Sequence, residues 1–383
     1  LIQFGVIVVV IDCMVEHEGN EVIQQKGCAI LALLASTENL QVNLSIAETD
    51  GIDMIVSALA GFTENTLIQT DACRALSHLS IDHESRMLIS SQGGLILLVN
   101  AMNKFREEVD LLEAACSALL NLSSDAEEQV LAGSSVVETV VSTMRHQLNA
   151  PRLQEKCLGV LQNISMRSKD SKRAIADAGG IGAVTFAIKE FMGSPSVLER
   201  SFTTMWSMAV LEQNQVIIAN EGGISLVING MMANITYEKV QKQACGCLCT
   251  LSSNSQNKTL IRDLGGVDAI VYAMWAHYNS EALLIEACRA LSSLAVNVQT
   301  NEVMIASEGE ISAIMSGMRR FPHSERLQEH ACVALRNFLL SADNAAIVQP
   351  QAAELQQLMN AASSRFPDRC ADRAKQVLAS LGH

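Results

Sequence analysis

Aromatic residues and proline are scarce in this chain. Only 4% of its 383 residues are Phe, Trp or Tyr, and it has five prolines. Proline breaks helices and aromatic residues favour strands, so this scarcity points away from an all-β protein. Segments in which Thr or Val alternate with polar residues are also hard to find. Because 49% of the residues are hydrophobic, the chain can fill a sizeable core, and we expect an all-α fold rather than disorder.

The chain also lacks an excess of basic residues. It has 27 Lys and Arg against 41 Asp and Glu, which gives a formal net charge of -14. Binding to phosphates requires a basic surface, so we expect no nucleic-acid partner and no attraction to an anionic membrane. Long apolar runs are missing as well. The apolar opening segment, 1–15, is shorter than the roughly 20 residues that cross a bilayer, and we expect no membrane insertion.

The sequence does contain an internal repeat with a period of about 43 residues. Segments such as "GGISLVINGM" at Gly222 and "GGVDAIVYAM" at Gly265 recur in eight copies. Two positions stand out when the copies are aligned. The first, here named the methionine column, is Met14, Leu59, Met102, Met144, Ile188, Met231, Met274 and Met318. The second, named the cysteine column, lies fourteen residues later and is Cys28, Cys73, Cys116, Leu158, Phe202, Cys245, Cys288 and Cys332.

Within each repeat the apolar residues have helical spacing. In "LLEAACSALLNLS", Leu112, Ala115, Cys116, Leu119 and Leu122 fall on one face of a helix. A shorter helix follows each glycine pair, and another short helix precedes the pair. Glycine accepts positive φ and lets the chain turn between these two helices. The pattern therefore predicts a short, a middle and a long helix in every repeat.

Three helices in about 43 residues resemble the armadillo repeat. The glycine-pair segments and long helices such as "LQEHACVALRN" at Leu327 carry the resemblance over nearly the whole chain. It implies a right-handed α-α superhelix, a single solenoid over residues 1–383. The expected repeats are 5–49, 50–92, 93–134, 135–178, 179–221, 222–264, 265–308 and 309–351, with a degenerate C-terminal cap at 352–383. The stretch "GMRRFPHSERLQEHACVAL" also resembles, more loosely, the armadillo region of Roco-type leucine-rich-repeat kinases.

The eleven cysteines raise the question of metal or disulfide chemistry. In "ACGCLCTLSS", Cys245 belongs to the cysteine column, Cys247 points to another side of the helix, and Cys249 lies one turn further on. A tetrahedral zinc site needs four ligands, and two thiols without a second pair of ligands do not make one. We therefore expect no metal. Neighbouring helix axes 8–10 Å apart are at the edge of what a disulfide can span. We expect buried thiols in a reducing compartment, the cytoplasm or the nucleus.

Catalytic motifs are not evident in the sequence. It contains no "GxxxxGK[ST]", "GxGxxG", "HExxH" or "GxSxG" segment. The glycine pairs recur at repeat joints and are read as turn glycines. The eight histidines are scattered, and none stands at catalytic spacing from a cysteine or an acid. We expect no enzymatic activity, no catalytic residues and no cofactor.

The resemblance implies that the long helices line a concave groove. Residues one and five positions after the cysteine column then face that groove. In nuclear-import adaptors of this fold these positions hold a tryptophan ladder and an asparagine ladder. The first position holds no tryptophan here, which disfavours a nuclear-transport adaptor. Together with residues two positions before the column, the candidate partner-binding residues are Arg74, His78, Asn121, Lys156, Asn163, Arg200, Arg289 and Asn337.

These residue types can hold a peptide. Asparagine pairs with a peptide backbone amide and carbonyl, and arginine takes a carboxylate bidentately. We therefore expect a non-enzymatic interaction scaffold that binds an extended segment or a partner protein in the groove. The alternative is a structural subunit of a large cytoskeletal or ciliary assembly, in which the outer face and the ends would be buried as well.

Overall fold

The computed structural model describes residues 2–37, 39–125, 135–297, 302–303 and 308–381. Helices dominate these ranges, and they form two compact units, Leu1–Ala183 and Val184–His383. Helix α13 (Gly180–Glu190) contains the boundary between the units. Each unit is built from the same short, middle and long helices, as α15, α16 and α17 show with nine, eleven and fourteen residues.

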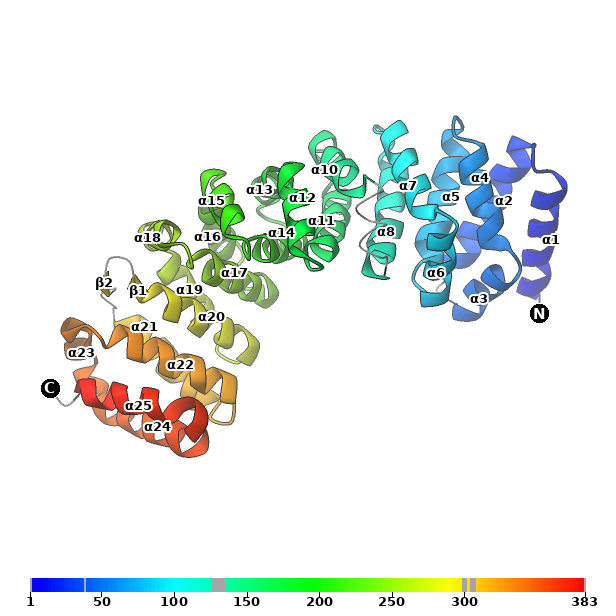
Figure 1. The fold of residues 1–383 in the computed structure, drawn as a ribbon. Helices are drawn as coiled ribbons and strands as arrows, with labels where there is room; N and C mark the ends of the chain where they lie inside the picture. The colour runs from blue at the N-terminus through cyan, green and yellow to red at the C-terminus, as the bar shows by residue number, and fades with distance from the viewer. Residues whose placement is uncertain (1, 38, 126–134, 298–301, 304–307, 382–383) are drawn as a thin grey trace. The chain divides into compact units, whose positions relative to one another are not determined.

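The helices of unit 1 fall into three sets by their place in the repeat (Figure 1). The first helices are α3 (Leu40–Glu48), α6 (His83–Ser91) and α12 (Lys169–Asp177). The second helices are α1 (Ile2–Glu16), α4 (Gly51–Gly61), α7 (Gly94–Lys104) and α10 (Val136–His146). The third helices are α2 (Glu21–Ala35), α5 (Thr66–Leu79), α8 (Val109–Asp125) and α11 (Pro151–Ser165).

Unit 2 repeats the arrangement. Its first helices are α15 (Glu212–Asn220), α18 (Ser255–Asp263) and α23 (Ala342–Val348), the last continued by the 3-10 turn η1 (Gln349–Gln351). Its second helices are α13, α16 (Gly223–Ala233), α19 (Gly266–Ala276), α21 (Glu308–Arg320) and α24 (Ala352–Arg365). Its third helices are α14 (Pro195–Met208), α17 (Glu238–Leu251), α20 (Glu281–Leu294), α22 (Glu325–Phe338) and α25 (Pro367–Leu381). Two short strands, β1 (Val296–Asn297) and β2 (Glu302–Val303), pair antiparallel.

The turn between first and second helices depends on backbone conformation. The first glycine of the pair has φ between 74° and 78° at Gly93, Gly179, Gly222 and Gly265. This left-handed region suits glycine because it has no Cβ. In two repeats Asp50 and Ser135 take the same conformation, with φ of 60° and 53°.

The third helices pack against one another in chain order within each unit. In unit 2, α14, α17, α20, α22 and α25 follow one another in this way (Figure 1). All eight residues of the cysteine column are fully buried between helices. Small thiols there act as compact hydrophobic side chains that allow close helix approach. Burial accordingly raises the pKa of the Cys28 and Cys288 thiols to about 12.

A buried glutamine ties the second helix to the third in five repeats. The Nε2 atom of Gln154 donates to the carbonyl oxygens of Met144, at 2.7 Å, and of Gln147, at 3.0 Å. The shorter bond of each pair reaches back ten residues, to the carbonyl of the methionine column, where the helix leaves carbonyls without intrahelical partners. The glutamines are Gln24, Gln69, Gln154, Gln241 and Gln328. Leucine takes the same place in the other repeats, at Leu112, Leu198 and Leu284.

One sequence expectation about cysteine needs correction. Cys13 is exposed and Cys249 is half-buried, so not every thiol is buried. All eleven cysteines are free thiols, although the Sγ atoms of Cys116 and Cys157 approach to 3.5 Å. Among the described residues no single helix combines the length and apolar composition of a membrane span.

Candidate binding surface

In unit 1 the predicted residue Arg74 is held by its own helix. Its guanidinium lies 3.1 Å from the carboxylate of Asp71, and 43% of the side chain is exposed. The other carboxylate oxygen of Asp71 accepts from Gln25 of the preceding third helix at 2.8 Å. This chain of contacts fixes the position of Arg74 while leaving part of the guanidinium open to a ligand.

Asn121 and Asn163 occupy equivalent positions on consecutive third helices, α8 and α11. The Nδ2 atom of Asn163 donates to the carbonyl of Leu120 at 3.0 Å and to Ser123 Oγ at 3.1 Å. Asn121 makes the same pair of bonds to Ser77 and Ser80 on α5. The two amides therefore brace each third helix against the one before it. Their Oδ1 atoms accept no hydrogen bond from any described residue.

The remaining candidates of unit 1 are His78 and Lys156. Both are half-buried on the same side of their helices as the asparagines. His78 lies four residues after Arg74, and Lys156 lies seven residues before Asn163. Helical spacing places His78 one turn from Arg74, and it places Lys156 two turns from Asn163 on the same face of its helix.

In unit 2 the candidates are Arg200, Arg289 and Asn337. Arg289 forms a 2.5 Å ion pair with Glu286, and 32% of its side chain is exposed. Asn337 again bonds to the preceding third helix, donating to the carbonyl of Ser292 at 2.8 Å, while its Oδ1 accepts from Arg336. Arg200 is half-buried on α14.

The pKa of His330 reflects the charges near α22. Burial and then the charge of Arg289 lower the pKa of His330, with Arg326 and Arg373 acting in the same direction and Glu329 against them. Burial and the neighbouring arginines therefore both disfavour the protonated form of this half-buried imidazole.

Sequence reasoning missed one residue of this surface, Trp206. Trp206 lies four positions after the cysteine column, one residue before the second predicted groove position. In the structure the half-buried indole lies against Gly246, where an added Cβ would come within 2.6 Å of the ring. Only glycine allows the ring this position. The sequence carried a signal for this contact, since Gly246 lies within the long helix of the repeat that follows Trp206.

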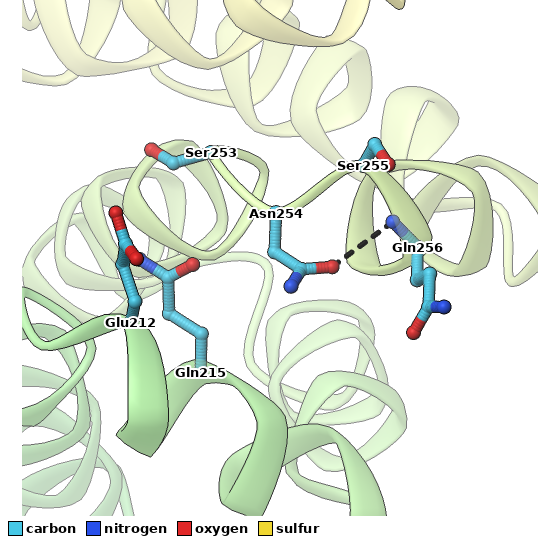
Figure 2. Close-up of a pocket in the computed structure, with 6 residues that line it drawn as sticks. All are labelled: Glu212, Gln215, Ser253, Asn254, Ser255 and Gln256. Carbon is cyan, nitrogen blue, oxygen red and sulfur yellow. Dashed lines mark hydrogen bonds between the residues drawn. The ribbon is translucent and has the colours of Figure 1, made fainter. Parts of the chain in front are cut away.

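A polar cavity of about 390 Å³ opens between the start of α15 and the turn that joins α17 to α18. Figure 2 shows Glu212 and Gln215 on one side of it and the segment 253–256 on the other. Asn254 Oδ1 accepts from the backbone of Gln256 at 2.9 Å, and Gln215 Nε2 donates to the carbonyl of Ala209 at 2.8 Å. These polar groups cap helix ends, so the cavity shows no feature aimed at a ligand.

The side chains on these surfaces can form hydrogen bonds, ion pairs and ring contacts. Among the described residues, no three His, Cys, Asp or Glu side chains gather as a metal site requires. Burial raises the pKa of most thiols of the cysteine column, which makes them poor nucleophiles. Amide oxygens, partly exposed arginines and a tryptophan ring are groups that bind peptides.

The repeating three-helix units and their exposed third-helix faces define an armadillo-repeat protein. A family model described as LRRK2 ARM repeat matches residues 3–177 and 186–381, which is nearly the whole chain. The chain therefore belongs to the LRRK2 ARM repeat family, and the predicted all-α armadillo fold is confirmed. No curated protein matches the sequence.

Solved structures agree on the fold. A structure concerning the interaction between cadherin and beta-catenin has a TM-score of 0.78 at 16% identity, covering 96% of this chain and 76% of that one. An engineered protein has a TM-score of 0.69 at 18% identity, with coverage of 98% and 99%. A designed armadillo repeat protein in complex with the peptide (KR)4 has a TM-score of 0.54 at 18% identity, with coverage of 63% and 99%.

Proposed function

We propose that this chain is a non-enzymatic protein-interaction scaffold of a reducing compartment, the cytoplasm or the nucleus. It binds an extended segment of a partner protein along the exposed faces of its third helices. Arg74, His78, Asn121, Lys156 and Asn163 contribute in unit 1. Arg200, Arg289 and Asn337 contribute in unit 2, together with Trp206.

The pair formed by Asn121 and Asn163 carries the proposal. Each amide nitrogen donates to the preceding helix, so each Oδ1 is held in a fixed direction, and no described residue uses it as an acceptor. Third helices pack about 8–10 Å apart. Two fixed acceptors on neighbouring helices can bind one extended strand without the cost of ordering them first.

A matched pair of variants tests the proposal in unit 1. Ser117→Arg places a long cation on the third-helix face, one turn before Asn121. The Ser117 hydroxyl donates to the Glu113 carbonyl of its own helix. Asn100→Arg makes the same charge change at an exposed position on the outer face of α7. Binding is measured by calorimetry with unstructured peptides selected from a random-sequence display library on the whole chain.

Ser117→Arg should weaken peptide binding by about tenfold or more, because the added side chain fills the path of the peptide. Asn100→Arg should leave the affinity within about twofold. Loss of binding in Asn100→Arg alone would place the partner on the outer face. That result would favour the alternative, a structural subunit of a larger assembly.

A further inference from the structure

One stretch of unit 2 is rich in exposed aromatic side chains. Among the residues whose exposure is described, they are Tyr237, Tyr272, Trp275 and Tyr278, with exposed fractions of 52%, 54%, 45% and 53%. The chain contains three tyrosines and two tryptophans in all. Every tyrosine and one of the two tryptophans therefore lie exposed within 42 residues of each other.

Helix geometry brings these rings onto one surface. Asp268, Tyr272 and Trp275 are spaced i, i+4 and i+7 on the outer face of α19, so they form one stripe. Tyr278 lies in the turn that follows. The His277 ring is bonded to the carbonyl of Ile235 at 2.7 Å, which joins this turn to the equivalent turn of the preceding repeat.

Tyr237 belongs to that preceding turn. The hydroxyl of Ser280 donates to the carboxylate of the next residue, Glu238, at 2.5 Å. Met232, with 48% of its surface exposed, occupies on α16 the position that Trp275 has on α19, and the two helices contact each other. We name Met232, Tyr237, Tyr272, Trp275 and Tyr278 the outer aromatic patch.

The fold does not require aromatic residues at these places. In the other repeats, nearly all residues at the equivalent positions are polar or small. The counterparts of Tyr272 are Asp12, Ser57, Asn100, Ser142, Phe186, Asn229 and Ser316. Those of Trp275, apart from Met232, are Val15, Ala60, Asn103, Arg145, Lys189 and Arg319. Only the Phe186 counterpart is aromatic, and it is half-buried. Apolar surface left in water is costly, and clustered Tyr, Trp and Met mark interaction sites.

Carboxylates flank the patch. Asp268 is exposed one turn before Tyr272, Glu238 follows Tyr237, and Glu281 is exposed three residues after Tyr278. The nearby cations each contact a polar or acidic side chain. Arg319 pairs with Glu354 at 2.9 Å, Arg320 donates to the Asn279 side chain, next to Tyr278, at 2.8 Å, and Lys239 lies 4.0 Å from Glu199. Aromatic faces carry negative potential, so rings bordered by carboxylates attract a cation and repel an anionic membrane.

We propose that the outer aromatic patch binds an arginine-bearing segment of a partner protein. The planar guanidinium stacks on the Tyr272 and Trp275 rings and pairs with the Asp268 carboxylate. The site lies on the second helices and the turns after them. It is thus independent of the third-helix faces assigned above, and either can exist without the other.

The two tryptophans make the site measurable. Trp206→Phe leaves Trp275 as the single indole, so its emission reports on the patch. The probe is an arginine–serine repeat peptide of eight residues, and the control peptide has glutamine in place of each arginine. The arginine peptide should change the Trp275 emission saturably, and the effect should weaken with added salt. The glutamine peptide should cause no saturable change.

Variants in the Trp206→Phe background locate the contact. Tyr272→Ala should lower the affinity for the arginine peptide by about threefold to thirtyfold, which is the range expected for losing a cation–π contact at a partly desolvated site. Tyr272→Phe should keep the affinity within about twofold, because the ring face is retained. Asp268→Asn should weaken binding and reduce its salt dependence. Ser316→Ala, at the matching position of α21, should have no effect.

Other occupants would overturn the proposal. Equal affinity for the glutamine peptide would show that the site binds peptides without recognising their positive charge. Full affinity in Tyr272→Ala, with an unchanged melting profile, would place the peptide elsewhere. Concentration-dependent dimers in sedimentation that Tyr272→Ala abolishes would assign the patch to a second copy of the chain. Co-sedimentation with phosphatidylserine vesicles that requires Tyr272 would assign it to a membrane.

Discussion

Helices α10 and α19 hold the same place in two different repeats, one in each unit. Their inner faces match, with Met144 and Met274 buried at the methionine column. Their outer faces differ, since Ser142 of α10 corresponds to Tyr272 of α19. The comparison shows that the buried positions of a repeat are fixed by packing against its neighbours. The outer positions carry no such constraint and can be used for recognition.

The largest expected change in stability tests the claim that the buried positions of a repeat are fixed by packing. Phe202→Ala removes a fully buried ring of the cysteine column in unit 2. It should lower the free energy of unfolding by about 3–5 kcal/mol, because truncation leaves a cavity. Tyr272→Ala, on the outer face of the same unit, should change it by no more than about 0.5 kcal/mol. Urea denaturation followed by circular dichroism measures both, and a similar loss in both variants would show that the outer aromatic side chains have a structural role.

An intermediate effect concerns the glycine turn. A Cβ at Gly94 would lie 2.8 Å from the carbonyl oxygen of Ile89 and 2.5 Å from its Cγ2 atom. Gly94→Ala should therefore destabilise unit 1 by about 1–3 kcal/mol through overpacking. Gly61→Ala is the matched control, because nothing lies within 4 Å of a Cβ there. It should be neutral or stabilise by about 0.5–1 kcal/mol. Thermal melts of the pair would contradict this explanation if both variants behaved alike.

The smallest effect is expected at the buried glutamines. Gln154→Leu loses two hydrogen bonds to carbonyls, but it also removes the Oε1 atom, which is buried without a partner. Three repeats already carry leucine at this position. The net change should stay within about 1 kcal/mol. Gln154→Ala should cost about 2 kcal/mol more than the leucine variant because it leaves a cavity. Equilibrium unfolding would refute this account if leucine proved as damaging as alanine.

The sequence predicted much of the fold because the repeat presents the same buried residues eight times. Met274 and Cys288 could be assigned to buried columns from their spacing alone. The positions of polar side chains were harder to predict, since they depend on contacts between repeats. Nothing in the sequence shows that the Asn163 amide nitrogen is engaged by the preceding helix. The contact between Trp206 and Gly246 requires two aligned repeats to be seen together.

The glutamine bonds have a further consequence for how such a chain can change in length. Each closes within a single repeat, and each asparagine bond reaches only the adjacent repeat. A segment of about 43 residues can therefore be duplicated or excised while every glutamine bond inside a remaining repeat keeps its partner. Evolution can lengthen or shorten the surface offered to partners through whole-repeat steps in the gene, and new outer residues can then diversify on an unchanged scaffold.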